Sequence, residues 1–289
     1  MATVQELQHI HLPAIAPEDF FILLAHITKK EKAFLFAHPE YELSPQKTRE
    51  LETFLKRRLK HEPIAYITGH KEFYGRDFKI TPDTLVPRPE TELLVESVLA
   101  QIRKNGRRMT DVIDMGTGSG NIIVSIAKEI EKLPAIENFF LSAIDISEGA
   151  LATARENARR HGVEQRIAFL KSDLFEHYSL PHKKNRNVII AANLPYLSKS
   201  IYRTSSSDVY DYEPESALVS GEQGLDHYRR LLLVLKKFSQ SYLETTFFLE
   251  ISPEQSNLLK EEIGVIFLSS SCQILQDLNG RDRLIQTTL

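Results

Sequence analysis

The sequence predicts an α/β fold in which a doubly wound sheet follows a small helical domain. From about Asp111 onward, short apolar runs alternate with helical patterns, an order that favours a parallel sheet with helices on both faces. From about Pro17 to Lys60 the patterns are helical. The stretch over residues 61–92 instead carries aromatics, glycines and prolines in hairpin-like order. We therefore expect a helical domain over 1–70, a hairpin linker over 71–88 and the α/β domain over 89–289.

Composition excludes several classes of protein. The chain has 289 residues, 42% hydrophobic and 26% charged, which is ordinary for a folded protein with a large core. A formal charge of -3 provides no sequence-wide attraction to nucleic acid. The single cysteine, Cys272, suits a reducing compartment, and no apolar run reaches the length of a membrane span. We expect a cytoplasmic monomer without a metal site, a membrane contact or direct binding to nucleic acid.

In the helical domain, two prolines mark helix starts. Pro17 and Pro45 fit first helical positions, and Ser44 is a suitable N-cap for the second helix. This second helix carries an apolar stripe at helical spacing, made of Leu51, Phe54, Leu55 and Leu59. Its basic residues over 56–60 are expected to form a solvated face.

Seven apolar runs are the expected strands of the sheet: residues 111–115, 139–145, 166–173, 187–193, 245–251, 265–270 and 283–289. Helical patterns such as 148–161 and 228–238 lie between most of them. Pro89 is expected to open a helix with Glu90 and Glu92 in its first turn, where they favour the helix dipole. Ligands of such sheets bind beyond the carboxyl ends of the strands, so the site is expected at the ends of the first four.

The first of these strands ends in a glycine-rich loop, Gly116-Thr117-Gly118-Ser119-Gly120. The nicotinamide fingerprint has the spacing Gly-x-Gly-x-x-Gly, and here the third glycine comes one residue early. This spacing favours a nucleoside without a pyrophosphate, as in S-adenosylmethionine. The alternative is an ordinary glycine turn.

The next two strands end in acidic residues. Asp145 can accept hydrogen bonds from both ribose hydroxyls, or it caps the following helix, a role that Ser147 could fill instead. Asp173 could accept from an adenine amino group, while Leu174 or Phe175 covers the face of the adenine.

The fourth strand ends in Asn193-Leu194-Pro195-Tyr196. The Asn193 side-chain oxygen and the Leu194 carbonyl are two acceptors that can hold the hydrogens of a planar amino group. Pro195 keeps Leu194 extended, and Tyr196 can stack on the plane that carries the amino group. We interpret this segment as a grip for such a group; a plain turn is the alternative.

Taken together, these segments resemble the protein-(glutamine-N5) methyltransferases that modify peptide chain release factors, the HemK/PrmC family of class I S-adenosylmethionine-dependent methyltransferases. The resemblance rests on residues 62–75, 85–94, 114–120, 143–163, 172–175, 193–196, 213–232 and 277–285. It implies a helical N-terminal domain that helps to dock the release factor. It also implies a Rossmann-like catalytic domain that methylates the glutamine of the factor's Gly-Gly-Gln loop.

The same resemblance implies roles for individual residues. Residues 116–120 and Asp145 would hold the cofactor, with Leu174 near the adenine. Asn193 would contact both cofactor and substrate, and the next three residues would line the glutamine slot. Arg88 and Glu90 would lie near this site, or serve only as residues of a helix start.

Two positions depart from the family pattern, and three other functions stay open. Leu194 stands where the family usually has proline; its carbonyl remains, so we expect a looser grip with activity retained. Ser252 stands where a glycine is common. The alternatives are a methyltransferase for a ribosomal-protein glutamine, one for the exocyclic amine of adenine, and a non-catalytic, ribosome-associated binding module that uses the basic residues 56–60.

Overall fold

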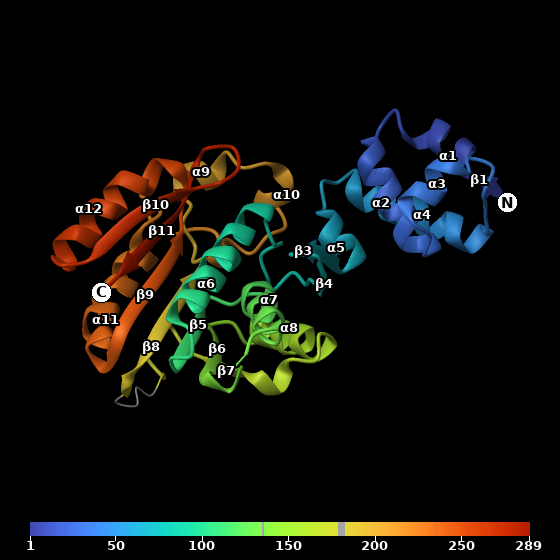
Figure 1. Cartoon of the computed structure of the whole chain (residues 1–289). Helices are drawn as coiled ribbons and strands as arrows, with labels where there is room; N and C mark the ends of the chain where they lie inside the picture. Colours follow the sequence, from blue (N-terminus) through green and yellow to red (C-terminus); the bar gives the residue numbers. More distant parts are fainter. Residues whose placement is uncertain (135, 179–182) are drawn as a thin grey trace. The chain divides into compact units, whose positions relative to one another are not determined.

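The computed structural model describes residues 1–134, 136–178 and 183–289, and the chain divides into two compact units (Figure 1). One unit comprises Met1–His70 together with Ser206–Tyr212. The other comprises Lys71–Ser205 and Glu213–Leu289. The short segment 206–212 is held in the first unit by the Tyr212 hydroxyl, which donates to the Lys60 carbonyl at 2.8 Å.

The first unit is built from short helices around one apolar core. Its elements are β1 (Ala2–Thr3), α1 (Val4–His11), α2 (Pro17–Thr28), α3 (Lys32–Ala37), β2 (Glu42–Leu43), α4 (Pro45–Arg58), α5 (Ile64–Thr68) and α10 (Ser207–Tyr210). β1 and β2 pair antiparallel. The sequence patterns predicted α2 and α4 but not α1 or α5.

The predicted helix starts and stripe can be compared directly with the structure. Pro17 and Pro45 begin α2 and α4, and the Ser44 hydroxyl caps α4 by accepting from the Lys47 amide at 3.4 Å. Of the stripe on α4, Leu51 and Leu55 are fully buried, while Leu59 is 50% exposed because it lies beyond the last turn of the helix. Phe54 packs on the edge of the core.

The hairpin expected within residues 61–92 is formed by β3 (His70–Phe73) and β4 (Arg76–Lys79). It precedes the short 3-10 helix η1 (Pro89–Thr91), which leads into α6 (Glu92–Asn105). Pro89 therefore opens a helical segment, as its position in the sequence predicted.

The second unit contains a seven-stranded sheet of order β10-β11-β9-β8-β5-β6-β7. The strands are β5 (Thr110–Met115), β6 (Phe139–Asp145), β7 (Ile167–Lys171), β8 (Lys183–Ala192), β9 (Tyr242–Glu250), β10 (Ser271–Gln276) and β11 (Asp282–Thr288). The prediction of a parallel sheet is confirmed for β7, β6, β5, β8 and β9. It is wrong for β11, which runs antiparallel to both β9 and β10. The connection between β10 and β11 holds only residues 277–281, too few for a parallel crossover.

The prediction of a strand over residues 265–270 is also wrong. Helix α12 (Ser256–Ile266) continues into this run, and the strand starts later, at Ser271. Ile263 and Phe267 are buried at helical spacing, whereas Val265 and Leu268 are 76% and 90% exposed. The buried residues of this run therefore continue the periodicity of α12. The strand had been predicted from the composition of the run alone.

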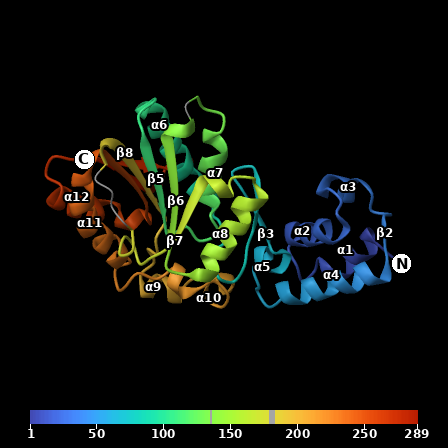
Figure 2. The same ribbon diagram turned by 90° about the horizontal axis from the view of Figure 1, so that it is seen from below.

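Helices cover both faces of the sheet. α6, α7 (Asn121–Ile130) and α8 (Glu148–Arg160) lie on one face, and α11 (Asp226–Phe238) and α12 lie on the other (Figure 2). α9 (Lys199–Arg203) follows β8. The remaining 3-10 helices are η2 (Ile136–Asn138), η3 (Glu164–Arg166), η4 (Glu215–Ala217), η5 (Ser239–Ser241) and η6 (Pro253–Gln255). Because both faces are covered, the middle of the central strands is apolar, as in residues 112–113 of β5 and 188–192 of β8.

The strand order decides where a ligand site can form. β6 lies on one side of β5 and β8 on the other, so the chain reverses its direction of travel across the sheet at β5. Such a switch point opens a crevice at the carboxyl ends of the strands. Among the described residues, no helix has both the length and the apolar character needed to cross a membrane.

Candidate active site

A cleft of about 300 Å³ lies in the second unit at the carboxyl ends of β5, β6, β7 and β8. Its lining includes these residues singled out from the sequence: Gly116, Thr117, Gly118, Ser119, Asp145, Asp173, Leu174, Asn193, Leu194, Pro195 and Arg88. Gly120, Tyr196 and Glu90 do not line it. The four strand ends that are distant in the sequence thus meet around one cavity.

The glycine loop has two glycines that the fold requires and one that faces open space. Gly116 has φ of +73°, and a Cβ there would lie 2.8 Å from Leu194 Cδ2. At Gly120, with φ of +78°, a Cβ would lie 3.0 Å from the Ala154 Cβ of α8. At Gly118 a Cβ would meet no described atom within 4 Å. The loop therefore leaves room for a ligand at Gly118.

Asp145 holds this loop in place, and the cap of the following helix is another residue. Its Oδ2 accepts from the Gly118 amide and its Oδ1 from the Ser147 amide, both at 2.9 Å. The cap of α8 is Ser147, whose hydroxyl accepts from the Ala150 amide at 3.2 Å. Burial raises the pKa of Asp145, while the two amides act in the opposite direction. Each carboxylate oxygen keeps a further lone pair for a ligand in the cleft.

A second carboxylate, Asp114, lies beneath the loop at the end of β5. It is fully buried, and its Oδ2 accepts from the Thr117 hydroxyl at 2.6 Å. Its Oδ1 has no partner among the residues that the structure describes. Burial, with a contribution from the charge of Asp145, raises the pKa of Asp114 to about 7. Asp114 thus fixes the conformation of the loop through Thr117.

The end of β7 contributes Asp173 and Leu174. Asp173 Oδ2 forms an ion pair with Arg230 of α11 at 2.7 Å, so only part of this carboxylate is free for another donor. Leu174 is buried and has φ of +50°, an uncommon backbone conformation for a residue with a side chain. Residues held in such conformations cluster at ligand sites, which makes this turn notable beside the cleft.

The turn after β8 is held by contacts on both of its sides. The Asn193 Nδ2 donates to Thr91 Oγ1 at 3.2 Å, at the end of η1. The Leu194 side chain is buried against Gly116, so the residue that departs from the family pattern is fixed by packing. The Tyr196 hydroxyl donates to Glu250 Oε1 at 3.3 Å. Burial and the nearby Glu250 raise the pKa of Tyr196, which keeps the phenol protonated.

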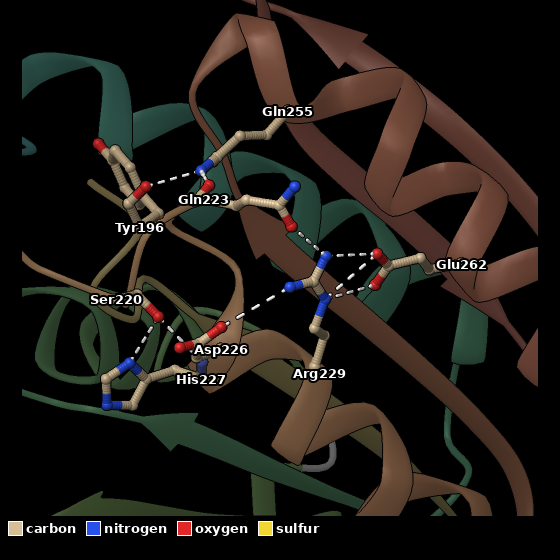
Figure 3. A network of polar contacts seen from close by, with 8 residues as sticks. All are labelled: Tyr196, Ser220, Gln223, Asp226, His227, Arg229, Gln255 and Glu262. Atoms are coloured by element: carbon tan, nitrogen blue, oxygen red, sulfur yellow. Dashed lines mark hydrogen bonds and ion pairs between the residues drawn. The ribbon is translucent and has the colours of Figure 1, made fainter. Parts of the chain in front are cut away.

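A polar network anchors the same turn to α11 and α12 (Figure 3). Gln255 Nε2 donates to the carbonyls of Tyr196 and Gln223, at 2.7 and 3.0 Å. The Gln223 side chain accepts from Arg229 at 2.8 Å, and Arg229 pairs with Glu262 of α12 at 2.7 Å. The turn is therefore tied by hydrogen bonds to the helical layer beneath it.

Ser252, the second departure from the family pattern, has a structural role in this network. It caps η6 in a capping box, in which its hydroxyl accepts from the Gln255 amide. The Gln255 Oε1 in return accepts from the Ser252 amide at 3.2 Å. This exchange leaves Gln255 Nε2 as the atom directed at the Tyr196 carbonyl.

Several residues of the site were missed in the sequence. Three of them line the cleft, namely Thr91, His227 and Arg230; the other three, Asp114, Glu213 and Glu250, accept hydrogen bonds from Thr117, Arg88 and Tyr196. Asp114 and Glu250 are carboxylates that follow short apolar runs near the carboxyl ends of β5 and β9, a signal that the sequence does contain. Glu213 carried no such signal, because its partners Arg88 and Val86 are more than 120 residues away. Among the described residues, no group of three or more potential ligands could hold a metal ion.

The fold and the site define the class of protein. Residues 107–281 match the sequence model described as a methyltransferase domain, and residues 4–69 match the model described as the PrmC N-terminal domain. The hMettl16 catalytic domain, solved with MAT2A 3′UTR hairpin 1, shares the fold. Its TM-score is 0.55 at 13% identity, over 94% of this chain and 91% of that chain. The protein is an S-adenosylmethionine-dependent methyltransferase.

Curated relatives identify the family within this class. A release factor glutamine methyltransferase of Nitratidesulfovibrio vulgaris is 39% identical over 222 residues, which cover 77% of this chain and 70% of the relative. One of Bacillus cereus is 32% identical over 266 residues, 91% of this chain and 89% of the relative. The chain belongs to the family of release factor glutamine methyltransferases.

Proposed function

We propose that this protein transfers a methyl group from S-adenosylmethionine to the side-chain amide nitrogen (N5) of a glutamine. The glutamine is that of the Gly-Gly-Gln loop in class 1 peptide chain release factors. The observation that carries the proposal is the Asn193–Tyr196 turn, held beside the cofactor cleft with two acceptor groups in succession. Membership of the family supports the choice of substrate.

The residues of the cleft fit S-adenosylmethionine. Gly118 leaves open space against the backbone, where a bulky ligand can approach closely. Asp145 keeps acceptor capacity for ribose hydroxyls, and Leu174 offers an apolar surface for the adenine. When bound, the cofactor supplies a methyl group that its sulfonium has already activated.

The chain's own contribution is to position and polarise the amide. An amide nitrogen is a poor nucleophile because its lone pair is delocalised into the carbonyl. The Asn193 oxygen and the Leu194 carbonyl would accept its two N–H groups and stabilise the positive charge that develops on nitrogen. Pro195 restricts Leu194 to extended geometry, and packing on Gly116 holds the Leu194 side chain. The proton can leave after methyl transfer, so no side chain is required as a general base.

The first unit would dock the release factor. Residues 1–70 would form the docking domain, 71–88 the linker and 89–289 the catalytic domain. The match of residues 4–69 to the PrmC N-terminal domain supports this division. The reaction would take place in the cytoplasm, where release factors act, with the enzyme working as a monomer.

The test is methyl transfer from labelled S-adenosylmethionine to a purified release factor and to the same factor carrying Gly-Gly-Ala. We expect label on the glutamine form alone. Asn193→Ala should lower the rate about a hundredfold or more, because it removes an oriented acceptor. Asn257→Ala, on the exposed side of α12, is the matched control and should keep full activity.

Other results would assign the protein differently. Equal label on both forms, or label on neither while the cofactor still binds, would exclude this glutamine. A ribosomal-protein glutamine or an adenine amine would then be the next substrate to test. A chain that does not bind the cofactor would support the non-catalytic binding module.

A further inference from the structure

His227, at the start of α11, lines the cleft and takes no part in the mechanism above. Its ring is held by the hydroxyl of Ser220, a residue that is 1% exposed (Figure 3). The Ser220 Oγ lies 2.7 Å from His227 Nδ1 and accepts from the His227 backbone amide at 2.9 Å. The Ser220 amide in turn donates to the Leu197 carbonyl at 2.9 Å, so the position of this hydroxyl is fixed by the fold.

The partners of Ser220 settle which ring nitrogen of His227 carries the proton. The Ser220 hydroxyl has a single hydrogen, and its acceptor among the described residues is Nδ1 of His227. A buried hydroxyl hydrogen without an acceptor is costly, so this hydrogen is directed at Nδ1. Nδ1 is then an acceptor, and the proton of the neutral ring is on Nε2, a tautomer assigned from its partners.

The surroundings of His227 keep its ring neutral. Burial lowers the pKa of His227, and the Arg230 guanidinium acts in the same direction. The carboxylates of Asp173 and Asp226 oppose this shift. A protonated ring would also carry a hydrogen on Nδ1, which would displace the Ser220 hydrogen from its acceptor. In both forms of the ring, Nε2 remains a donor.

This donor lies next to an acceptor. His227 and Arg230 are one turn apart on α11, so their side chains leave the same face of the helix. Arg230 donates to Asp173 Oδ2 at 2.7 Å, which leaves Asp173 Oδ1 as an acceptor just after β7. All three residues line the cleft, and Nε2 is on the side of the His227 ring away from Ser220 (Figure 3). The cleft therefore presents an N–H donor beside a carboxylate oxygen.

Adenine carries the complementary pair of groups. Its amino group is a donor, and the ring nitrogens on either side of that group, N1 and N7, are acceptors. We propose that His227 binds the cofactor by donating Nε2–H to N1 or N7 of the adenine, beside the amino group held by Asp173. Ser220 is a positioning residue that fixes the required tautomer. The proposal rests on the cofactor in the function proposed above and not on which glutamine is methylated.

Calorimetric binding of S-adenosylhomocysteine and its deaza analogues tests the contact. In each analogue a C–H group replaces one ring nitrogen of the adenine. We expect the wild type to bind either the 1-deaza or the 7-deaza analogue about tenfold more weakly, because the Nε2–H donor is left unpaired. The 3-deaza analogue is the matched control ligand, since N3 does not adjoin the carbon that bears the amino group. Its affinity should stay within about twofold of that of S-adenosylhomocysteine.

Variants of His227 show whether this side chain is the donor. His227→Phe keeps a ring and removes the donor, so it should bind S-adenosylhomocysteine about tenfold more weakly. It should also no longer distinguish that ligand from the analogue that the wild type binds poorly. His227→Gln can offer an N–H group at a comparable distance and should recover most of the affinity. His177→Phe is the matched control, because His177 is exposed and does not line the cleft. It should match the wild type with every ligand.

A second measurement needs no ligand. The two neutral tautomers of histidine differ in the ¹⁵N shifts of their ring nitrogens. In long-range ¹H–¹⁵N spectra of protein labelled with ¹⁵N-histidine, we expect the proton of His227 on Nε2, with its signals assigned by their loss in His227→Gln. Ser220→Ala should give a mixture of both tautomers. Ser220→Thr keeps the hydroxyl and should give the Nε2–H tautomer alone.

The outcomes separate the two proposals. A wild type that does not methylate release factors, but loses affinity for the 1-deaza or the 7-deaza analogue alone, would exclude the proposed substrate and leave the adenine contact standing. Methylation of release factors together with equal affinity for all three analogues would overturn the contact. A loss with the 3-deaza analogue alone, or one that persists in His227→Phe, would overturn it as well. So would a neutral His227 ring with its proton on Nδ1.

Discussion

Replacing Asp114 by asparagine should change the stability of the protein in a pH-dependent way, with a net gain over the wild type at about pH 8. The carboxyl of Asp114 is fully buried, and its pKa is raised from an ordinary 3.8 to about 7. A group with a raised pKa in the folded state stabilises that state at low pH and loses this contribution as pH rises. Once pH lies above both values, the cost of ionising the buried Asp114 is about 4 kcal/mol.

The size of the effect at each pH follows from linkage. At about pH 5 the carboxyl of the unfolded chain is ionised and that of the folded chain is not, so the cost is about 2 kcal/mol. At about pH 8 it reaches about 4 kcal/mol. Asp114→Asn removes this dependence and keeps an oxygen for the Thr117 hydroxyl. Its new amide N–H group has a constant cost of about 1–3 kcal/mol.

Urea unfolding of both proteins without cofactor, followed by circular dichroism, measures the difference. The stability of Asp114→Asn minus that of the wild type should grow by about 2–3 kcal/mol between about pH 5 and about pH 8. A difference that is constant across this range, or that shrinks, would refute the argument that Asp114 is desolvated under the loop. Asp111→Asn serves as a comparison, since Arg186 pairs with that carboxylate at 3.1 Å.

Two further predictions concern the cofactor loop. Gly116→Ala should destabilise the protein more than Gly118→Ala, because both have positive φ but only the first meets Leu194, at 2.8 Å. Each should lose about 1–2 kcal/mol to backbone strain, and equal losses in thermal unfolding would contradict the packing of Leu194 on the loop. Asp145→Asn should weaken the binding of S-adenosylhomocysteine about tenfold to a hundredfold in calorimetry, since charge-assisted bonds contribute about 1.5–3 kcal/mol each. Unchanged affinity would mean that Asp145 only braces the loop through its bond to Gly118.

Much of this site could be predicted from local sequence. The glycine loop, Asp145, Asp173 and the Asn193–Tyr196 turn each follow an apolar run. Because the strands that carry them are parallel, their carboxyl ends had to meet along one edge of the sheet. The spacing of the glycines and the succession of polar groups after β8 were visible without any tertiary information.

Prediction from the sequence was wrong or undecided where two local patterns were equally plausible. The run 265–270 has the composition of a strand but follows the period of α12, and packing of Ile263 on the core decided between them. Asp145 and Ser147 were both suitable helix caps. In the structure the Asp145 carboxylate accepts from the amide of Gly118, which follows another strand. The residue that caps α8 is Ser147.

By itself, then, the sequence determined which residues end the strands and what chemistry they carry. Only the tertiary structure decided how those residues are oriented, because their partners come from distant parts of the chain. Asn193 is directed by Thr91, 102 residues away, and Tyr196 by Glu250, 54 residues away. Hydrogen-bond direction depends on which donor faces which acceptor after packing, and a local pattern holds no information about such a choice.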